Sequence, residues 1–199
     1  MVDSEDEQVR TKRSYVPRAE GQVALINATI ELLREVPLPD VTVRKIAERA
    51  NLNTMAITNI FGSQQALFVA VARELLDRFS VTMASQPVEQ MQFSLLTDED
   101  LNLRTRLVAW LILQGADPEV FIIERALNVS DVFMGRQQQD GATEGQSWLF
   151  TQILQFLVEG FIIFREAHPQ RPEDLIKAAA ILQRIREEFP KMAGDLGIY

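Results

Sequence analysis

The stretch AERANLNTMAITNIF, residues 47–61, decides the fold of this chain because it places a tight turn between two short helical segments. Apolar residues recur at helical spacing on both sides of the turn. Asn51 stands where the chain must reverse direction within a few residues, which requires a positive φ. Asparagine is the residue other than glycine that adopts this conformation most readily. We therefore predict a helix-turn-helix whose left-handed turn is held by Asn51.

Two short helices are expected around this turn, over VRKIAERA (43–50) and TMAITNI (54–60). Helices of this length are not stable alone, so each must pack against the other and against a third helix. An apolar helix over residues 18–36, ended by a proline-rich turn, supplies that partner. Thr42 and Asn53 are the predicted N-caps of the two short helices.

Composition and charge describe an ordinary globular protein with 47% hydrophobic and 24% charged residues. No cysteine is present, which excludes disulfides and fits a reducing cytoplasm, and the polar N-terminus lacks the apolar segment of a secretory signal. The net charge of −8 is unevenly distributed. Residues 8–61 contain eight basic and five acidic residues, a balance of +3, so the rest of the chain carries −11. This asymmetry is typical of a small anion-binding module joined to an acidic body.

The whole chain has helical spacing, and no alternating segment bounded by hairpin turns is found. We expect an all-α fold in three parts. The first is a disordered, mixed-charge arm at residues 1–17. A domain at 18–80 contains the helix-turn-helix and a linking helix, and a second helical domain occupies residues 81–199.

Within the C-terminal part, Thr97 is the expected N-cap of a helix that continues through Leu113. Residues 135–145, GRQQQDGATEG, are an expected loop. Two long helices follow, at residues 146–167 and 173–189.

The run VTVRKIAERANLNTMAITNIFGSQQAL (41–67) resembles the DNA-binding domain of the tetracycline-repressor (TetR-like) family of bacterial transcriptional regulators. The resemblance is carried by TVRKIAERA, the following turn, Ile57, Phe61, Ser63 and Leu67, and it covers residues 18–80. It implies an all-helical, cytoplasmic homodimer whose N-terminal domain reads double-stranded DNA. It also implies a C-terminal domain for dimerisation that binds a small-molecule effector, which lowers the affinity for DNA.

Three positions depart from the family pattern. The family usually has an aromatic residue at Thr58, Tyr or His at Ile60, and Lys at Gln64. Because the Tyr and Lys of relatives typically touch phosphates, their loss removes contacts to the DNA backbone. An alternative therefore stays open, in which the chain is a helical dimeric binding protein for a lipid-like ligand or a protein partner and has lost DNA binding.

The resemblance places the second short helix in the major groove, with its exposed side toward the bases. Without an arginine to take guanine, and with an asparagine able to pair with adenine, this helix predicts an operator that leans toward A·T pairs. The basic arm either contacts DNA or is a solubilising tail. The predicted DNA-binding residues are Arg10, Lys12, Arg13, Thr42, Arg44, Lys45, Asn53, Thr54, Met55, Ala56, Thr58, Asn59 and Gln64.

The segment WLFTQILQFLVEGFIIF (148–164) has 12 apolar residues in 17, yet it is too short and too often interrupted by polar residues to span a membrane. Its apolar arc is too wide for a single packing partner, so a second subunit is expected to cover part of it. The following helix offers a narrow apolar seam, which predicts a four-helix interface across a twofold axis. The predicted interface residues are Leu149, Phe156, Gly160, Phe164, Leu175, Ala178, Leu182, Ile185 and Phe189.

Other large apolar or polar residues of this half either form plain core or line a cavity for an uncharged, largely apolar effector. They are Met83, Met91, Trp110, Gln114, Phe121, Asn128, Phe133 and Phe150. An enzyme is not expected, because His168 is the single histidine and neither a Gly-rich phosphate loop nor a cluster of metal ligands is present. We therefore expect no catalytic residues, cofactor or metal.

Overall fold

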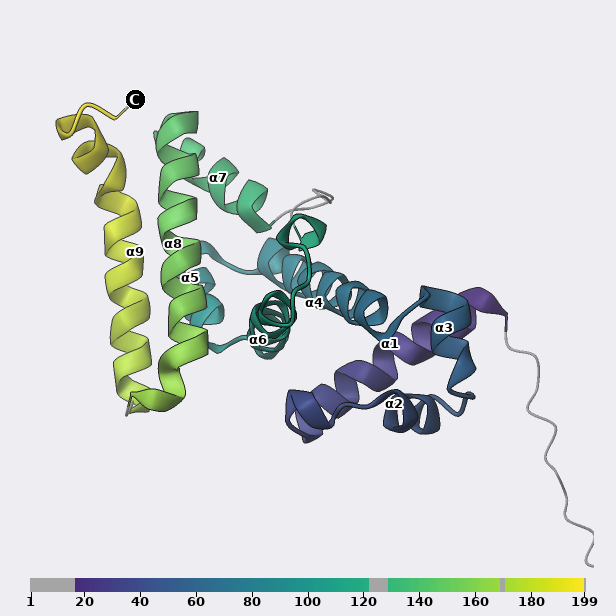
Figure 1. Cartoon of the computed structure of the whole chain (residues 1–199). Coiled ribbons are helices and arrows are strands. Elements are labelled where there is room, and N and C mark those ends of the chain that lie inside the picture. Colours follow the sequence, from purple (N-terminus) through teal and green to yellow (C-terminus); the bar gives the residue numbers. More distant parts are fainter. Residues whose placement is uncertain (1–16, 122–128, 169–170, 199) are drawn as a thin grey trace, which may run out of the picture. The chain divides into compact units, whose positions relative to one another are not determined.

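The computed structural model describes residues 17–121, 129–168 and 171–198, and every regular element in these ranges is a helix (Figure 1). The predicted all-α fold is confirmed. The chain divides into two compact units, Met1–Leu67 and Phe68–Tyr199.

The first unit is a three-helix bundle. Because α2 and α3 have only seven residues each, the burial of Ile46, Ala47 and Ile57 against the apolar side of α1 is what stabilises them. The elements are α1 (Arg18–Glu35), the 3₁₀ turn η1 (Leu38–Asp40), α2 (Val43–Arg49), α3 (Met55–Phe61) and the first turn of α4 (Gln64–Ser85).

The second unit is built around α8, which lies beside α9 and also packs against α5, α6 and α7 (Figure 1). Its elements are the rest of α4, α5 (Val88–Thr97), α6 (Glu99–Leu113), η2 (Pro118–Phe121), α7 (Val129–Gln139), α8 (Glu144–Phe164), η3 (Arg165–Ala167) and α9 (Pro172–Asp195).

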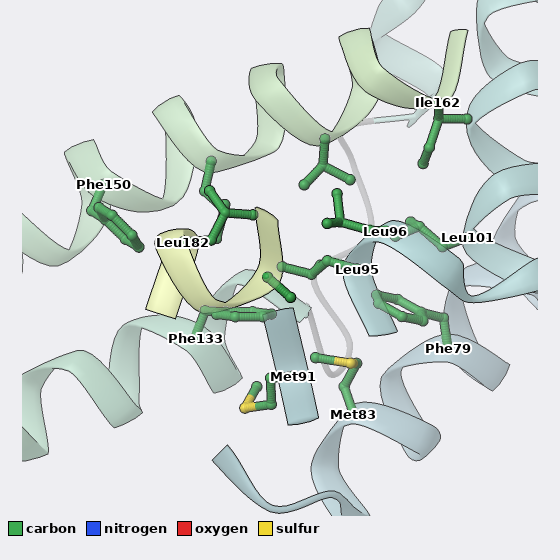
Figure 2. Packing of buried hydrophobic residues seen from close by; sticks show 13 residues of the cluster. Phe79, Met83, Met91, Leu95, Leu96, Leu101, Phe133, Phe150, Ile162 and Leu182 are labelled. Carbon is green, nitrogen blue, oxygen red and sulfur yellow. The ribbon is translucent and has the colours of Figure 1, made fainter. Parts of the chain in front are cut away.

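Much of the core of the second unit is a cluster of buried apolar side chains to which α4 to α9 all contribute (Figure 2). Helix α8 faces this cluster along a single stripe, because its buried residues recur every fourth position. The cluster comprises Phe79, Met83, Met91, Leu95, Leu96, Leu101, Phe133, Phe150, Leu154, Val158, Ile162, Ala179 and Leu182.

The predicted N-cap at Thr97 is wrong. Thr97 is the last residue of α5, and its hydroxyl donates to the carbonyl of Phe93 at 2.8 Å. Asp98 caps α6 instead, since its carboxylate accepts from the backbone N–H of Leu101 at 2.9 Å. A carboxylate there also interacts favourably with the helix dipole.

The loop predicted at 135–145 is too long. Helix α7 continues to Gln139, because glutamine is a good helix former and the amide of Gln137 donates to the buried hydroxyl of Thr151 at 3.2 Å. Thr143 and Gln146 then form a capping box that starts α8.

The last helix runs past its predicted end at residue 189 and continues through Pro190 to Asp195. The amide of Gln146 holds this extension, since it donates to the carbonyl of Pro190 at 3.4 Å and to that of Ile198 at 2.8 Å. The chain end is thereby fastened to the start of α8.

Candidate nucleic-acid interface

The turn after α2 has the geometry that the sequence predicted. Asn51 has φ 54°, the one positive φ of a non-glycine residue in the described part of the chain. Its N–H donates to the carbonyl of Glu48 at 3.1 Å, and that of Leu52 donates to the carbonyl of Ala47 at 2.9 Å. These two bonds form a Schellman motif, which commonly ends a helix with a left-handed residue. The prediction for Asn51 is confirmed.

Side-chain caps then fix where each short helix begins. Thr42 accepts from the N–H of Lys45 at 3.4 Å, and Asn53 accepts from the N–H of Ala56 at 2.9 Å. Both predicted caps are confirmed, although α3 itself starts at Met55. Together with the turn, they help to orient α3 relative to α2.

Arg49 fastens α2 to α1. Its guanidinium donates to Glu35 at 2.9 and 2.6 Å and to Glu31 at 3.3 Å. These contacts lower the pKa of Glu35 and raise the pKa of Arg49. Arg18 in addition donates to the carbonyl of Ile60 at the end of α3, at 3.1 Å. Arg49 is therefore engaged within the protein and is not free for phosphate.

The outward side of α3 consists of Thr54, Met55, Thr58 and Asn59, which are all exposed as predicted. Met55 keeps 68% of its surface exposed, although it is an apolar residue. Ile57, on the opposite side, is fully buried. This surface, which we call the reading face, carries no acidic side chain and therefore does not repel a phosphate backbone.

The charges beside the reading face are more balanced than the sequence suggested. Arg44 donates to Glu48 at 2.8 Å, which raises the pKa of Arg44. Lys45 is exposed and forms no ion pair with any described residue. Residues 17–67 contain five basic and five acidic side chains, so this stretch is neutral. The surplus of three positive charges comes from Arg10, Lys12 and Arg13, which lie outside the described residues.

Gln64 was predicted to contact phosphate, but its amide donates to the carbonyl of Val41 at 2.9 Å. This bond ties the start of α4 to the segment before α2. The sequence pattern could not reveal it, because the two residues are far apart in the chain and no spacing rule links them.

The predicted pocket residues are mostly packed in the core of the second unit. Trp110 packs edge-on against Phe68, with ring centroids 5.9 Å apart. Gln114 is exposed, Phe121 is partly exposed, and Asn128 lies outside the described residues. The core members are Met83, Met91, Phe133 and Phe150.

The predicted dimer residues divide into two groups. Phe156 and Phe164 on α8 are 73% and 61% exposed, and Ile185 on α9 is also exposed. Leu182 is only 7% exposed within its own chain, and the ring of Phe189 packs on Phe150 with centroids 4.9 Å apart. Leu182 and Phe189 therefore pack toward the core of their own subunit, and their place in a dimer interface stays a prediction. The partly exposed members are Leu149, Gly160, Leu175 and Ala178.

An exposed apolar row includes Phe156, Phe164 and Ile185 of the predicted set and four residues that were not predicted, Ile153, Leu157, Ile181 and Met192. We call it the outer face and define it as Ile153, Phe156, Leu157 and Phe164 of α8 with Ile181, Ile185 and Met192 of α9. The segment Glu144–Ala167, which contains the α8 part, is long and apolar enough to cross a membrane by length and composition. Its buried stripe toward α5, α6, α7 and α9 is that of a packed helix.

Comparisons with known proteins agree with this geometry. Residues 25–71 match the model of the bacterial regulatory proteins of the tetR family. The chain is similar to TetR from Acinetobacter baumannii AYE, with 19% identity over 88% of this chain and 97% of that chain and a TM-score of 0.50. A TetR variant from the same organism, in complex with minocycline, gives 18% identity over 87% and 96% of the two chains and a TM-score of 0.52. No curated protein sequence matches the chain.

At these identities the solved structures establish the fold, while the family match covers the helix-turn-helix with its Schellman turn and exposed reading face. Residues 25–71 therefore match the tetR family of bacterial regulatory proteins, and the all-helical fold of the chain is shared with solved TetR structures.

Proposed function

We propose that this protein is a cytoplasmic bacterial repressor that binds a palindromic operator as a homodimer and is released by a small, largely apolar effector. The observation that carries the proposal is the reading face: four uncharged side chains on a helix whose ends are fixed by the Asn51 turn and the Asn53 cap. A helix held in this way can enter the major groove without rearrangement of the protein.

Base recognition would come from the reading face itself. Asn59 can donate to and accept from adenine in one plane, and the apolar side chain of Met55 can contact a thymine methyl. The hydroxyl groups of Thr54 and Thr58 can form hydrogen bonds with either A·T or G·C base pairs. Since no arginine lies on this face, guanine lacks its usual partner, and the half-site should lean toward A·T pairs.

Phosphate contacts would come from the flanks of the reading face. Lys45 is exposed and has no ion-pair partner among the described residues, so it is the cation of this unit that is best placed for a phosphate. Thr42 and Arg44 lie on the same helix start, although Arg44 already has Glu48 as a partner. Because residues 17–67 are neutral, Arg10, Lys12 and Arg13 would have to supply much of the salt-dependent affinity.

Dimerisation would cover the outer face. Soluble monomers rarely expose a large contiguous apolar surface, and this one includes two phenylalanine side chains and several isoleucines. A twofold interface buries the same patch on both copies, so one patch is sufficient for a closed dimer. Two reading faces would then meet half-sites about one helical turn apart.

Release by an effector rests on the second unit. The fold likeness to a TetR variant that holds minocycline supports a small-molecule site in a helical unit of this kind. The apolar character of the cluster around Met83, Met91, Phe133 and Phe150 favours a ligand with an apolar body.

The alternative, a dimeric binding protein without DNA affinity, is favoured by two observations. The amide of Gln64 is engaged with Val41, and residues 17–67 carry no net positive charge. Both reduce the phosphate contacts that a repressor needs.

Selection of bound sequences from random duplex DNA at low salt separates these functions. The proposal predicts a palindrome with A·T-rich half-sites centred about 34–36 Å apart. G-rich half-sites would contradict the proposed base contacts. A folded dimer that enriches no sequence would favour the alternative.

A further inference from the structure

Helix α6 carries buried polar atoms for which the described residues offer no partner. The Nε of Arg104, the Oγ1 of Thr105 and the Oδ1 of Asn102 are all buried without a hydrogen bond. The amide nitrogen of Asn102 does bond, to the carbonyl of Asp98 at 2.8 Å. Buried polar groups in folded proteins are nearly always paired, so unpaired atoms on three residues of one helix are unusual.

Arg104 is the most costly of these groups, because it is charged. Glu159 of α8 acts on it electrostatically, yet no ion pair joins the two, and Glu159 accepts instead from the amide of Gln155 at 2.9 Å. Burial lowers the pKa of Arg104, although a guanidinium stays protonated at neutral pH. A buried cation without a close partner is unfavourable in the free protein.

A second arginine on the same helix shows the ordinary arrangement. Arg106 is exposed and pairs with Glu166 at 3.3 Å. Arg104, only two residues earlier, is partly exposed, while the Nε of its guanidinium lies buried. The two side chains therefore offer a test and its matched control.

Two residues near Arg104 and Glu159 along their helices belong to the apolar core. Leu101, one turn earlier on α6, and Val158, next to Glu159, both belong to the core cluster. A ligand that meets the guanidinium here would place its remaining atoms among hydrocarbon side chains. The group that best complements a guanidinium is a carboxylate, which accepts two parallel N–H bonds.

We infer that the second unit binds an organic carboxylate, whose acid group pairs with Arg104 and whose apolar body lies toward the core cluster. The inference rests on the proposed function, because this carboxylate would be the effector. The effector would then carry one anionic group on a largely apolar body. Binding would supply the partner that Arg104 lacks in the free chain.

The test is a panel of ligands measured by calorimetric titration of the full-length protein. The panel consists of the linear acids from butanoate to dodecanoate, benzoate and 1-naphthoate, each with its primary amide as a neutral match. We expect at least one acid to bind at least tenfold more tightly than its amide, a ratio typical of a charge-assisted pair. Arg104→Met should abolish that preference, and Arg106→Met should keep it. An absence of any acid preference in the wild type, or a preference that survives Arg104→Met, would overturn the inference.

Folding and DNA binding are followed separately. If Arg104→Met does not fold, Arg104→Lys replaces it, and the preference should fall without vanishing because the charge stays while the paired N–H bonds are lost. An unchanged preference in Arg104→Lys would contradict a bidentate contact. Failure of the wild type to enrich any DNA, with the acid preference intact, would refute the repressor and leave the carboxylate site standing. Enrichment of an operator sequence, together with no preference for acids over amides, would refute the carboxylate site alone.

Discussion

The two units differ in how many buried polar atoms lack a hydrogen-bond partner and in how many large apolar residues are exposed. In the described part of Met1–Leu67, no buried side-chain polar atom lacks a partner, and Val23 and Met55 are the exposed large apolar residues. In the described part of Phe68–Tyr199, eight buried polar atoms lack a partner, and fifteen large apolar residues are exposed.

This difference indicates two kinds of task. The first unit leaves no buried polar group of its described residues unpaired, and it presents one ordered surface that can bind a partner without changing shape. The second unit leaves apolar area and polar groups unmatched, as expected of a body that is completed by a second copy and by a ligand.

The largest effect is expected from Phe156→Glu. A carboxylate in the outer face would be buried twice in a symmetric dimer, so the dimer should weaken at least a hundredfold, about 3 kcal/mol. Sedimentation equilibrium measures this directly. Leu113 on α6 is 83% exposed and lies outside the outer face, so Leu113→Glu is the control and should leave the dimer intact. Equal effects of the two variants would mean that the outer face is not the interface.

The next effect concerns the turn. Asn51→Val forces a β-branched residue to φ 54° and should lower the free energy of unfolding by about 2 kcal/mol. Asn51→Gly, which accepts this conformation, should cost nothing comparable. Urea unfolding checks both variants. A valine variant as stable as the glycine variant would show that the positive φ at residue 51 is not needed to hold α3 in place.

A smaller effect is expected from Lys45→Gln. Each lost phosphate contact reduces the slope of log affinity against log salt by about 0.9, hence by about 1.8 for a dimer. Binding to the selected operator between low and moderate salt gives this slope. Gln22→Ala, an exposed polar substitution on α1, should leave it unchanged. If Lys45→Gln also leaves the slope unchanged, then Lys45 does not touch the backbone.

The smallest effect concerns Glu35, whose pKa is lowered from its ordinary value of 4.5 by Arg49. The Glu35 carboxylate binds a proton more readily in the unfolded chain than in the folded protein. Its contact with Arg49 therefore stabilises the fold above pH 4.5, and this stabilisation is lost as the pH falls through the lowered pKa of the folded protein. Glu35→Gln should therefore be less stable at pH 7 and approach the wild type in acid. A pH-independent difference in urea unfolding would show that the ion pair is not its source.

Sequence reasoning succeeded where the structure depends on near neighbours. Asn51, Thr42 and Asn53 each bond to a backbone group three residues away, so residue identity and spacing were sufficient to predict this geometry. The exposure of Thr58 and Asn59 followed from the helical period once the buried position of Ile57 was known.

It was insufficient where contacts join distant segments. The apolar seam through Leu182 and Phe189 was visible, but the period alone cannot decide whether a seam faces its own core or a second subunit. The bond from Gln64 to Val41 and the unmatched guanidinium of Arg104 both depend on how helices meet, which no local pattern encodes.

Base recognition by the reading face can be tested by measuring how tightly the dimer binds its selected operator, for the wild type and for the double variant Thr58→Ala/Asn59→Ala at one salt concentration. We expect the double variant to bind the operator about tenfold to a hundredfold more weakly and unrelated DNA equally well, because base contacts are lost and phosphate contacts are kept. An operator affinity equal to that of the wild type, in a variant that folds and dimerises normally, would contradict base recognition by this face.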